Sequence, residues 1–566
     1  MRHHSRCVAL AAAALMAAGA ALAQAGPETV PTRPAPFREL AMTPSPTNVV
    51  DVTLKLAFGE YQIGADKVHL RTYNGKLVSD PLVVKPGDTL RVRLENALDC
   101  PKGATCTCKP DPCADGKESP AAHVHGALAG APPANIFNST NLHTHGLHVS
   151  PRCHSDNVFV DVEPGCGFSY EFKIPADHPA GTYWYHPHVH GATAIQVSSG
   201  AEGALIVKGA FDEVPGIRGA KDEILLFQQI PYKCDFQTAA NWACKPGQVG
   251  LVQDFAQQFG PGKWDASKRY TTINGVVQPA ITLRPEEVRR WRLIHGGLRE
   301  KVVVAVGRKA GAAFTVEKGW LHLIALDGLP TGDVRQKDRV ELDPGYRADV
   351  MIRAPKEPGT YYLLDEPSTR LLAPLNAAQR AEETPLEPLK VLAVIKVEGK
   401  PCSDPQNPCH RDLPRPEQLA GFRLPSITDA EIAGRQPQKV YFDIKNGAFT
   451  VCGKAYDPKA EPRRLEFGKA DEWVVASSTV AGHPFHIHVN PFEVIDETTG
   501  ERYWKDTLFV DKGKTVKVRM RYETFDGDFV LHCHILDHED QGMMETVRIA
   551  PGPQPVEACP PLNKVP

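Results

Sequence analysis

The stretch HCHILDHEDQGMM, which runs from His532 to Met544, constrains the fold of this chain more than any other. Cys533 stands between two histidines, and His538 and two methionines follow it. A thiolate, imidazoles and a distant methionine sulfur are the ligands of an electron-transfer copper site, which needs one more histidine than this stretch provides. In an extended strand, neighbouring side chains point to opposite faces. We therefore expect Cys533 to face one metal while His532 and His534 face another centre.

Three further motifs supply histidines in strand-like contexts: NLHTHGLH, WYHPHVH and HPFHIH. Their histidines are His143 and His145, His186 and His188, and His483, His486 and His488. Alternation along a strand puts both imidazoles of a His-x-His pair on one face, where they can share a metal cluster. Imidazole binds copper well. One such pair would be weak evidence of a metal site, but four pairs together with a Cys/Met set predict a copper protein.

The N-terminus predicts export. Arg2 and Arg6 precede an apolar, alanine-rich run that ends Ala21-Leu22-Ala23. This pattern indicates a signal peptide over residues 1–23, cleaved after Ala23. A membrane anchor is the alternative, but the run is short for a spanning helix, and no later segment is apolar enough to span. Residues 24–45 are rich in proline and lack periodicity, so we expect an N-terminal arm.

Charge and cysteine content restrict the partners and the compartment that we expect for the protein. The formal net charge of −3 argues against nucleic acid or an anionic membrane as the main partner. Of 14 cysteines, 14 − 2 = 12 remain once Cys7 of the leader and Cys533 are set aside. In an exported protein these are expected to form disulfides. The expected pairs are Cys153 with Cys166, Cys234 with Cys244, and Cys402 with Cys409. The dense group Cys100, Cys106, Cys108 and Cys113 is interpreted as two disulfides in a surface loop, with a second soft-metal site as the alternative.

Alternating segments separated by Pro-Gly and Gly-Thr turns predict an all-β protein of antiparallel strands. The rhythm occurs three times: TLRVRLEN echoes VRRWRLIH, and GTYWYHPH echoes GTYYLLDE and GDFVLHCH. We therefore expect three β-sandwich units over 46–210, 211–400 and 401–566, the first interrupted by a Cys-rich insert at 98–135. A long linker is expected within 365–438.

The middle repeat has no histidine pair. Its lone His295 and His322 are expected to be ordinary core or turn residues. The metal ligands would then come from the first and third units alone, which places the cluster at their mutual interface. The middle unit is expected to act as a spacer and a wall.

The four motifs together resemble those of the multicopper oxidases, in particular the three-domain laccase-like group. The resemblance covers nearly all of the mature chain, including TINGVVQP and VRRWRLIH of the middle repeat. It implies three cupredoxin-like Greek-key β-sandwich or barrel domains, with no copper ligands in the middle one. It also implies four copper ions: one type 1, one type 2 and two type 3.

The resemblance also implies a role for each ligand. His483, Cys533 and His538 match the type 1 ligands, with Met543 axial and Met544 as its rival. His143 and His486 match the type 2 ligands. The residues that match the type 3 ligands are His145, His186, His188, His488, His532 and His534.

Four other histidines lie close to these motifs. His123 and His125 form HVHG in the Cys-rich insert and mimic the first motif, but without its strand context. His148 and His190 fall outside the matched positions. We interpret them as neighbours of the ligands or as exposed residues, with a weak secondary metal site as the alternative.

Two acids stand where laccase-like relatives place proton donors. Glu539 directly follows His538, and Asp156 follows the first motif. Reduction of dioxygen consumes protons, so both are candidate catalytic acids. The alternative for each is a solvated or structural carboxylate.

The expected function is that of a monomeric laccase-like oxidase. Its partners would be dioxygen and a small-molecule reducing substrate, phenolic or an aromatic amine. The first alternative is a metal-ion oxidase acting on Cu(I), Fe(II) or Mn(II). Only seven methionines occur, with no cluster outside the ligand motif, which weighs against capture of Cu(I) by thioethers. A non-enzymatic copper-binding or structural role is the second alternative, disfavoured because the ligand motifs are intact.

Overall fold

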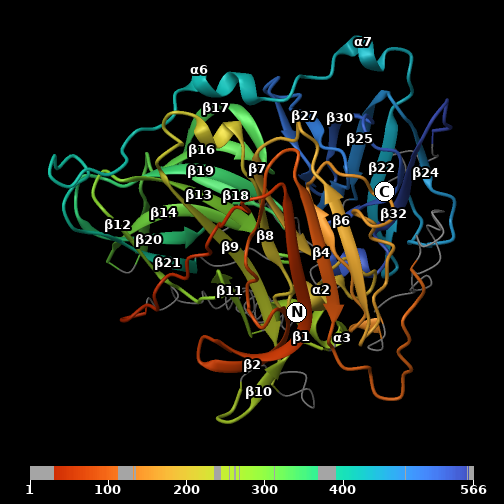
Figure 1. Cartoon of the computed structure of the whole chain (residues 1–566), viewed down its shortest axis with the longest axis horizontal. Helices are drawn as coiled ribbons and strands as arrows, with labels where there is room; N and C mark the ends of the chain where they lie inside the picture. The colour runs from red at the N-terminus through yellow and green to blue at the C-terminus, as the bar shows by residue number, and fades with distance from the viewer. Residues whose placement is uncertain are drawn as a thin grey trace, which may run out of the picture.

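The computed structural model describes residues 31–111, 132, 136–234, 244–253, 255–259, 263–266, 268–311, 313–366, 390–478, 480–556 and 559. Strands dominate this part of the chain and its helices are short (Figure 1), so the all-β prediction is confirmed. The predicted signal peptide lies outside the described residues. Within these residues, no helix is long and apolar enough to cross a membrane.

The first block consists of two sheets that share one core. The five-stranded sheet has the order β10 (Val249–Leu251), β2 (Asp66–Tyr73), β1 (Val49–Ile63), β4 (Thr89–Asn96) and β6 (Gly167–Lys173). The four-stranded sheet has the order β3 (Leu82–Val84), β8 (Gly203–Val207), β7 (Gly181–His186) and β5 (His143–His145). Strand β10 comes from the sequence range expected for the second unit, so that range contributes an edge strand to the first block.

The second block has two larger sheets. One has the order β11 (Lys268–Ile273), β9 (Lys221–Tyr232), β13 (Val288–His295), β19 (Arg347–Arg353), β16 (Leu321–Leu326) and β17 (Leu329–Lys337). The other has the order β12 (Ala280–Leu283), β21 (Lys390–Val397), β20 (Gly359–Asp365), β14 (Val302–Ala310) and β15 (Ala313–Val316), and β18 (Arg339–Leu342) also pairs with β14. The arm lies against this block, because the Phe37 N–H donates to the Ala280 carbonyl.

The third block repeats the arrangement. One sheet has the order β23 (Ala448–Val451), β22 (Gln438–Lys445), β25 (Ala470–Ser477), β30 (Thr515–Arg521), β27 (Phe492–Ile495) and β28 (Arg502–Lys505). The other has the order β24 (Arg463–Glu466), β32 (Met544–Ala550), β31 (Gly527–Cys533), β26 (His483–Ile487) and β29 (Thr507–Val510).

The sequence echoes occupy equivalent places in the three blocks. Strands β7, β20 and β31, which carry GTYWYH, GTYYLLD and GDFVLHC, each pair antiparallel with the strand that follows them in the chain. Strands β4 and β13 each pair in parallel with the long first strand of theirs. The repeats are therefore copies of one topology. The domain boundaries at residues 210 and 400 stay predictions.

The sheets are mixed, whereas antiparallel strands were expected. Parallel pairs join β1 to β4, β9 to β13 and β22 to β25, one in each block. Alternation of polar and apolar residues marks a half-buried strand in either direction, so it could not reveal these pairs. A parallel pair needs a crossover connection, and the turn residues in the sequence predicted only tight turns.

Short helices connect the strands. They are α2 (Thr193–Val197), η2 (Ala210–Glu213), α3 (Phe255–Phe259), α4 (Lys263–Ala266), α6 (Pro416–Leu419), η3 (Ala420–Phe422), α7 (Asp429–Ile432) and α8 (Leu536–Asp540). The long connection that holds α6 and α7 runs along one side of the molecule from the second block to the third (Figure 1). Helix α8 belongs to the His532–Met544 motif and packs on α2 of the first block.

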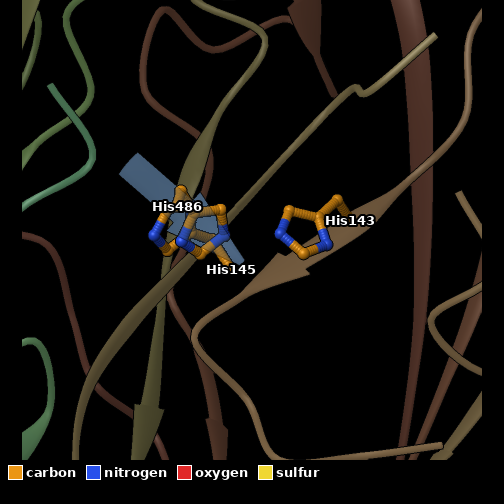
Figure 2. A group of neighbouring side chains, drawn as sticks. All are labelled: His143, His145 and His486. Atoms are coloured by element: carbon orange, nitrogen blue, oxygen red, sulfur yellow. The ribbon is translucent and has the colours of Figure 1, made fainter. Parts of the chain in front are cut away.

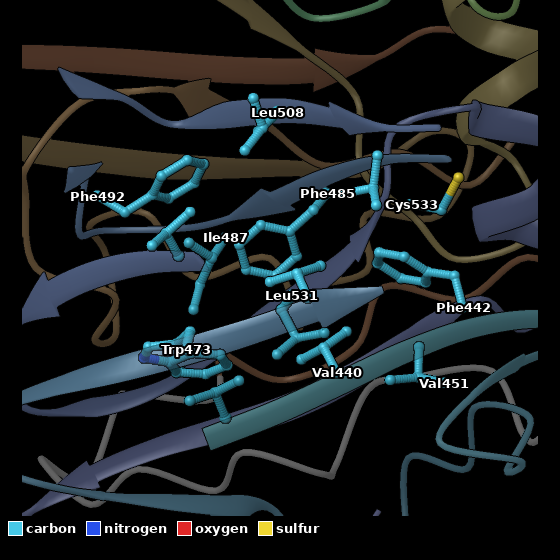
Figure 3. Packing of buried hydrophobic residues seen from close by; sticks show 14 of the residues in the cluster. Val440, Phe442, Val451, Trp473, Phe485, Ile487, Phe492, Leu508, Leu531 and Cys533 are labelled. Atoms are coloured by element: carbon cyan, nitrogen blue, oxygen red, sulfur yellow. The ribbon is translucent and has the colours of Figure 1, made fainter. Parts of the chain in front are cut away.

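Each block encloses its own apolar core. The core of the third block contains Trp473, Phe485 and Leu531, and Cys533 lies at its edge (Figure 3). Apolar burial of this extent is the main driving force for folding each block. Cys533 is thus anchored in a packed core rather than on a loop.

The cysteines form disulfides, as predicted for an exported protein, but not all of the predicted pairs are present. Cys234–Cys244 and Cys402–Cys409 are confirmed. The prediction of Cys153–Cys166 is wrong, because Cys166 bonds to Cys108 of the Cys-rich insert. The fold carries the insert back over that loop, which spacing along the chain could not show. Cys153 is also disulfide-bonded.

The Cys-rich group is held by disulfides where the structure describes it. Cys100 bonds to Cys106 within the loop, and Cys108 leaves the loop to reach Cys166. Cys113, His123 and His125 lie outside the described residues. A further disulfide, Cys452–Cys559, fastens the C-terminal end to the third block.

Candidate metal centre

Strand register brings the four histidine motifs together. His143 and His145 are the two ends of β5, and His143 stands opposite His186 of β7. In the third block, His486 of β26 stands opposite His532 of β31. Apolar residues next to most of these histidines, such as Leu142, Phe485 and Leu531, pack into the cores and favour strands here. The register therefore sets the imidazoles side by side.

Eight histidines from the first and third blocks converge in one buried cluster. Their ring nitrogens form three groups whose members lie within 4.8 Å of one another. The groups are His143, His145 and His486; His145, His186 and His534; and His188, His488 and His532. Each group combines both blocks, as the expected interface requires. Figure 2 shows the first group, in which the His145 and His486 rings lie against each other with centroids 3.9 Å apart.

The cluster is chemically prepared to hold metal ions. Buried ring nitrogens without a hydrogen-bond partner occur on five of its histidines: His143, His186, His486, His488 and His534. An unsatisfied buried polar atom costs free energy, so a native structure needs a reason for each one. Metal coordination provides that reason for the Nε2 atoms of His143, His186 and His486, because these residues belong to the groups whose ring nitrogens approach one another. The residues present therefore fit a set of copper ions.

Burial keeps these imidazoles neutral, which is the form that binds a metal. Loss of hydration on burial lowers the pKa values of His186, His486 and His532 to about 3. Burial and the neighbouring imidazoles hold the pKa values of the other five well below the usual range. A cluster of neutral donors is thus present before any metal arrives.

Backbone carbonyls fix the orientation of three of the rings. The Nδ1–H groups of His186, His532 and His486 donate to the carbonyls of Pro187, Cys533 and Asp506 at 2.8, 3.0 and 2.8 Å. Such contacts set the tautomer and leave Nε2 for the metal.

The second candidate site surrounds Cys533. His538 Nδ1 lies 4.0 Å from the Cys533 sulfur, and the rings of His483 and His538 are 5.4 Å apart. His483 and the Nε2 atom of His538 lack hydrogen-bond partners, although both residues are buried. Burial raises the pKa of the Cys533 thiol, so the copper-free protein carries it protonated. The Ile535 N–H donates to the sulfur at 3.4 Å.

The packing separates the two candidate axial methionines. Met543 belongs to the same core cluster as Cys533. Met544 instead packs with Tyr456 and Val530 in a different cluster. This arrangement favours Met543 as the residue beside Cys533.

Both predicted acids are buried, so neither is a solvated carboxylate. Asp156 accepts a hydrogen bond from His143 Nδ1 at 3.0 Å and from the Thr144 N–H at 2.8 Å. Burial raises the pKa of Asp156 to about 7. The carboxyl group of Glu539 lies 3.5 Å from His188 Nδ1 and 3.3 Å from His532 Nδ1. Both acids therefore touch histidines of the cluster.

A second buried acid, Asp540, lies next to Glu539 and raises its pKa further. Asp540 accepts hydrogen bonds from the backbone N–H groups of Gly191, Thr193 and Ala194, which oppose the effect of burial, but burial still raises its pKa to about 7. Burial, together with the charge of Asp540, holds the pKa of Glu539 well above its usual range. Asp540 was not singled out in the sequence, because an acid next to an acid carries no motif of its own.

Four other histidines named in the sequence analysis, His148, His190, His295 and His322, belong to none of the histidine groups of the cluster. His148 Nδ1 donates to the Val489 carbonyl at 2.8 Å, and the ring of His190 packs edge-on against Tyr456. His295 is a satisfied turn residue, as expected, since its Nε2–H donates to the Glu300 carbonyl at 2.6 Å. His322 lies buried on β16.

Comparison with known proteins identifies the family. Two family models described as multicopper oxidase match residues 134–211 and 433–553, which hold all four histidine motifs. A laccase of Bacillus stratosphericus is 32% identical over 413 residues, which cover 67% of this chain and 73% of the relative. The multicopper oxidase mco of Staphylococcus haemolyticus is 22% identical over 84% of this chain and 83% of its own length.

Solved structures show the same fold over nearly the whole chain. A multicopper oxidase from Pediococcus acidilactici aligns with a TM-score of 0.66 and 20% identity, covering 94% of this chain and 95% of its own. A Campylobacter jejuni multicopper oxidase, described as a metallo-oxidase, aligns with a TM-score of 0.61 and 21% identity, covering 93% and 96%.

The chain belongs to the multicopper oxidase family, and its fold consists of cupredoxin-like β-sandwich domains. It is accordingly an oxidoreductase that takes electrons from a reducing substrate and passes them to dioxygen, with copper as cofactor.

Proposed function

We propose that the chain is a laccase-like oxidase that couples four one-electron oxidations of a phenol or aromatic amine to the reduction of dioxygen to water. One observation carries the proposal: Cys533 sits in a second buried site while its two chain neighbours belong to the eight-histidine cluster. A single residue thus connects the two centres through covalent bonds. Electron delivery to an oxygen-reducing cluster needs such a connection.

The proposed ligand set follows the geometry. His483, Cys533, His538 and Met543 would hold the type 1 copper, and His143 and His486 the type 2 copper. The two type 3 ions would take the two groups of three that remain, which are His145, His186 and His534, and His188, His488 and His532. When bound, these coppers supply one-electron acceptance at Cys533 and reduction of dioxygen at the cluster.

Two acids of the chain would assist the reaction, one by supplying a proton and the other by orienting a ligand. Glu539 holds a proton beside His188 and His532, where dioxygen reduction consumes protons. Asp156 orients His143 through its Nδ1–H group. The complete burial of both sites keeps bulk water away from them.

Glu539→Gln is expected to slow reoxidation of the reduced protein by dioxygen about 100-fold, because the amide keeps the shape and loses the acidic proton. Reduction by substrate should proceed at the parent rate, since Cys533 and its neighbours are untouched. Stopped-flow measurement of both half-reactions on one sample tests this. Equal reoxidation rates in variant and parent would remove Glu539 from the mechanism.

The substrate class is tested by kinetics. We expect a higher kcat/KM for a dimethoxyphenol than for Cu(I), Fe(II) or Mn(II), because the chain has only seven methionines and no thioether cluster outside the ligand motif. A strong preference for one of these metal ions would replace the laccase proposal with that of a metal-ion oxidase. A purified protein without copper and without blue colour would favour the structural role.

We also propose that the protein is exported after cleavage behind Ala23 and acts as a monomer. The disulfides in the described residues support an oxidising compartment. One chain supplies all eight histidines of the cluster, so no second copy is needed to complete it.

A further inference from the structure

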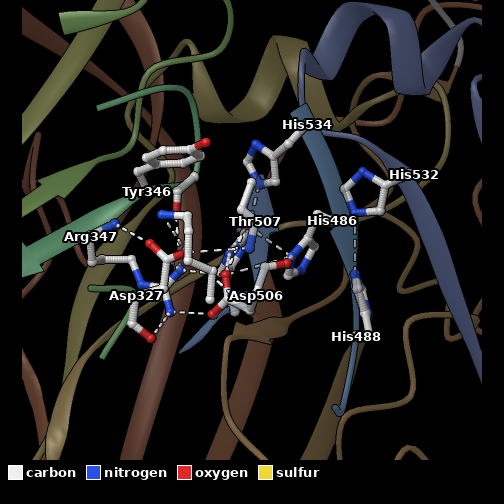
Figure 4. Close-up of polar contacts among 12 residues, drawn as sticks. Asp327, Tyr346, Arg347, His486, His488, Asp506, Thr507, His532 and His534 are labelled. Atoms are coloured by element: carbon white, nitrogen blue, oxygen red, sulfur yellow. Dashed lines mark hydrogen bonds and ion pairs between the residues drawn. The ribbon is translucent and has the colours of Figure 1, made fainter. Parts of the chain in front are cut away.

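One buried arginine, Arg347, joins all three blocks beside the histidine cluster, and Figure 4 shows it with Asp327 and Asp506. Arg347 begins β19 of the middle block and is fully buried. Its Nε–H donates to the Thr182 carbonyl of the first block at 3.2 Å. Its Nη1 and Nη2 groups donate to the Gly345 and Asp327 carbonyls, both at 2.9 Å, and to the two carboxylate oxygens of Asp506. All five donors of the guanidinium are therefore engaged.

The carboxylate that Arg347 holds touches the cluster. Asp506 Oδ1 lies 3.3 Å from His145 Nε2, and the Asp506 carbonyl accepts from His486 Nδ1 at 2.8 Å. The hydroxyl of Thr507 donates to Asp506 Oδ1 at 2.8 Å and lies 3.2 Å from His145 Nε2. With Nε2 engaged, His145 presents Nδ1 to the cluster, 3.2 Å from His534 Nε2.

The atoms around this contact are tightly packed. A Cβ on Gly146, next to His145, would stand 2.3 Å from Arg347 Nη2 and 2.5 Å from Asp506 Oδ2. A Cβ on Gly345 would stand 2.9 Å from His534 Nε2. Both glycines have a positive φ, which side chains disfavour. The guanidinium and the carboxylate therefore fit between the backbone and the histidines in one arrangement.

We infer that Arg347 is a positioning residue of the histidine cluster, supplied by the block that has no histidine pair. By holding Asp506, it fixes His145 and His486 in the orientation that binds copper. The middle block is then more than a spacer and a wall, because it sets the copper affinity of a site to which it gives no ligand. This inference rests on the proposed function.

A matched residue separates this role from that of an ordinary interdomain ion pair. Arg292 of β13 is also fully buried in the middle block. Its partners are the carboxylates of Asp212, Asp222 and Asp349 and the Thr182 hydroxyl. Arg292 thus copies the burial and the carboxylate pairing of Arg347, with partners that do not touch the cluster.

The experiment compares Arg347→Lys, Asp506→Asn and the control Arg292→Lys with the parent. Each copper-loaded protein is dialysed against a series of chelator-buffered copper concentrations. Elemental analysis gives the copper retained, the blue absorption reports the Cys533 site, and the electron paramagnetic resonance signal of type 2 copper reports the cluster.

We expect the first two variants to lose cluster copper at about 10- to 100-fold higher free copper than the parent, which is the usual cost of removing a group that orients a ligand. Lysine has three donors on a point charge and cannot reproduce the five-donor fork. The blue absorption should persist. Arg292→Lys should keep the parent's copper affinity even if its unfolding midpoint falls.

Either of two results would overturn this inference and leave the proposed function standing. The first is parent copper affinity in both Arg347→Lys and Asp506→Asn, and the second is an equal loss of cluster copper in Arg292→Lys. If Arg347→Lys does not fold, Asp506→Asn decides, because it removes the charge and keeps the shape. A parent that takes up no copper would overturn the proposed function and this inference with it.

Discussion

Cys533→Ser is expected to lose the blue colour and all substrate oxidation while it keeps the fold and the copper of the histidine cluster. Serine has nearly the volume of cysteine, so the core of the third block stays packed. Its hydroxyl is a hard ligand and does not replace a thiolate on copper. Visible absorption, copper content per chain and oxidation of a dimethoxyphenol, measured on one preparation, test the prediction.

Met544→Leu is a suitable control for this variant. Met544 is buried next to the same motif but packs away from Cys533, so leucine should leave the colour and the activity close to those of the parent. A serine variant that stays blue, or that oxidises substrate at the parent rate, would show that Cys533 is not the entry point for electrons.

The histidines that meet in the cluster could be predicted from the sequence because each lies in a short motif whose geometry is local. A His-x-His pair on a strand has both rings on one face, whatever the rest of the fold does. The interface between the first and third blocks also followed from the sequence, since the middle repeat has no histidine pair. His295 supports the same reasoning. It is not part of a histidine pair, and its ring donates to the carbonyl of Glu300, a neighbour in the chain, instead of joining the cluster.

The residues that orient the ligands could not be predicted in this way. Asp506 and Arg347 are far apart in the sequence, and neither stands in a histidine motif. They meet only because three blocks close on one point, which is a property of the tertiary structure. The wrong pairing of Cys153 with Cys166 has the same cause, since Cys108 reaches Cys166 through the folding of a loop.

Removal of copper is expected to make the protein acid-labile. Burial lowers the pKa values of His186, His483, His486 and His532 to about 3, and those of the other six proposed ligand histidines also lie well below 6.5. The unfolded chain then binds more protons than the folded one between about pH 6.5 and pH 3, so stability falls as the pH falls through this window. Each imidazole costs about 2 kcal/mol at pH 5.

The buried acids work in the opposite direction but are fewer. Burial raises the pKa values of Asp156, Glu539 and Asp540, so the folded protein regains stability as these groups take up protons below about pH 7. Glu202 and Asp537 are further buried carboxyls with raised pKa values. Ten imidazoles against these five carboxyls leave a net loss of stability as the pH falls from about 7 to about 5.

Copper should suppress this loss, because a metal that binds only the folded state stabilises it and occupies the nitrogens that protons would take. Circular dichroism of the copper-free and copper-loaded proteins, unfolded by denaturant at about pH 7, 6 and 5, measures the difference. We expect the copper-free protein to be clearly less stable at about pH 5 than at about pH 7, and the loaded protein to lose much less stability over this range. Equal stability of the copper-free protein at both ends of this range would show that its histidines are not held neutral by burial.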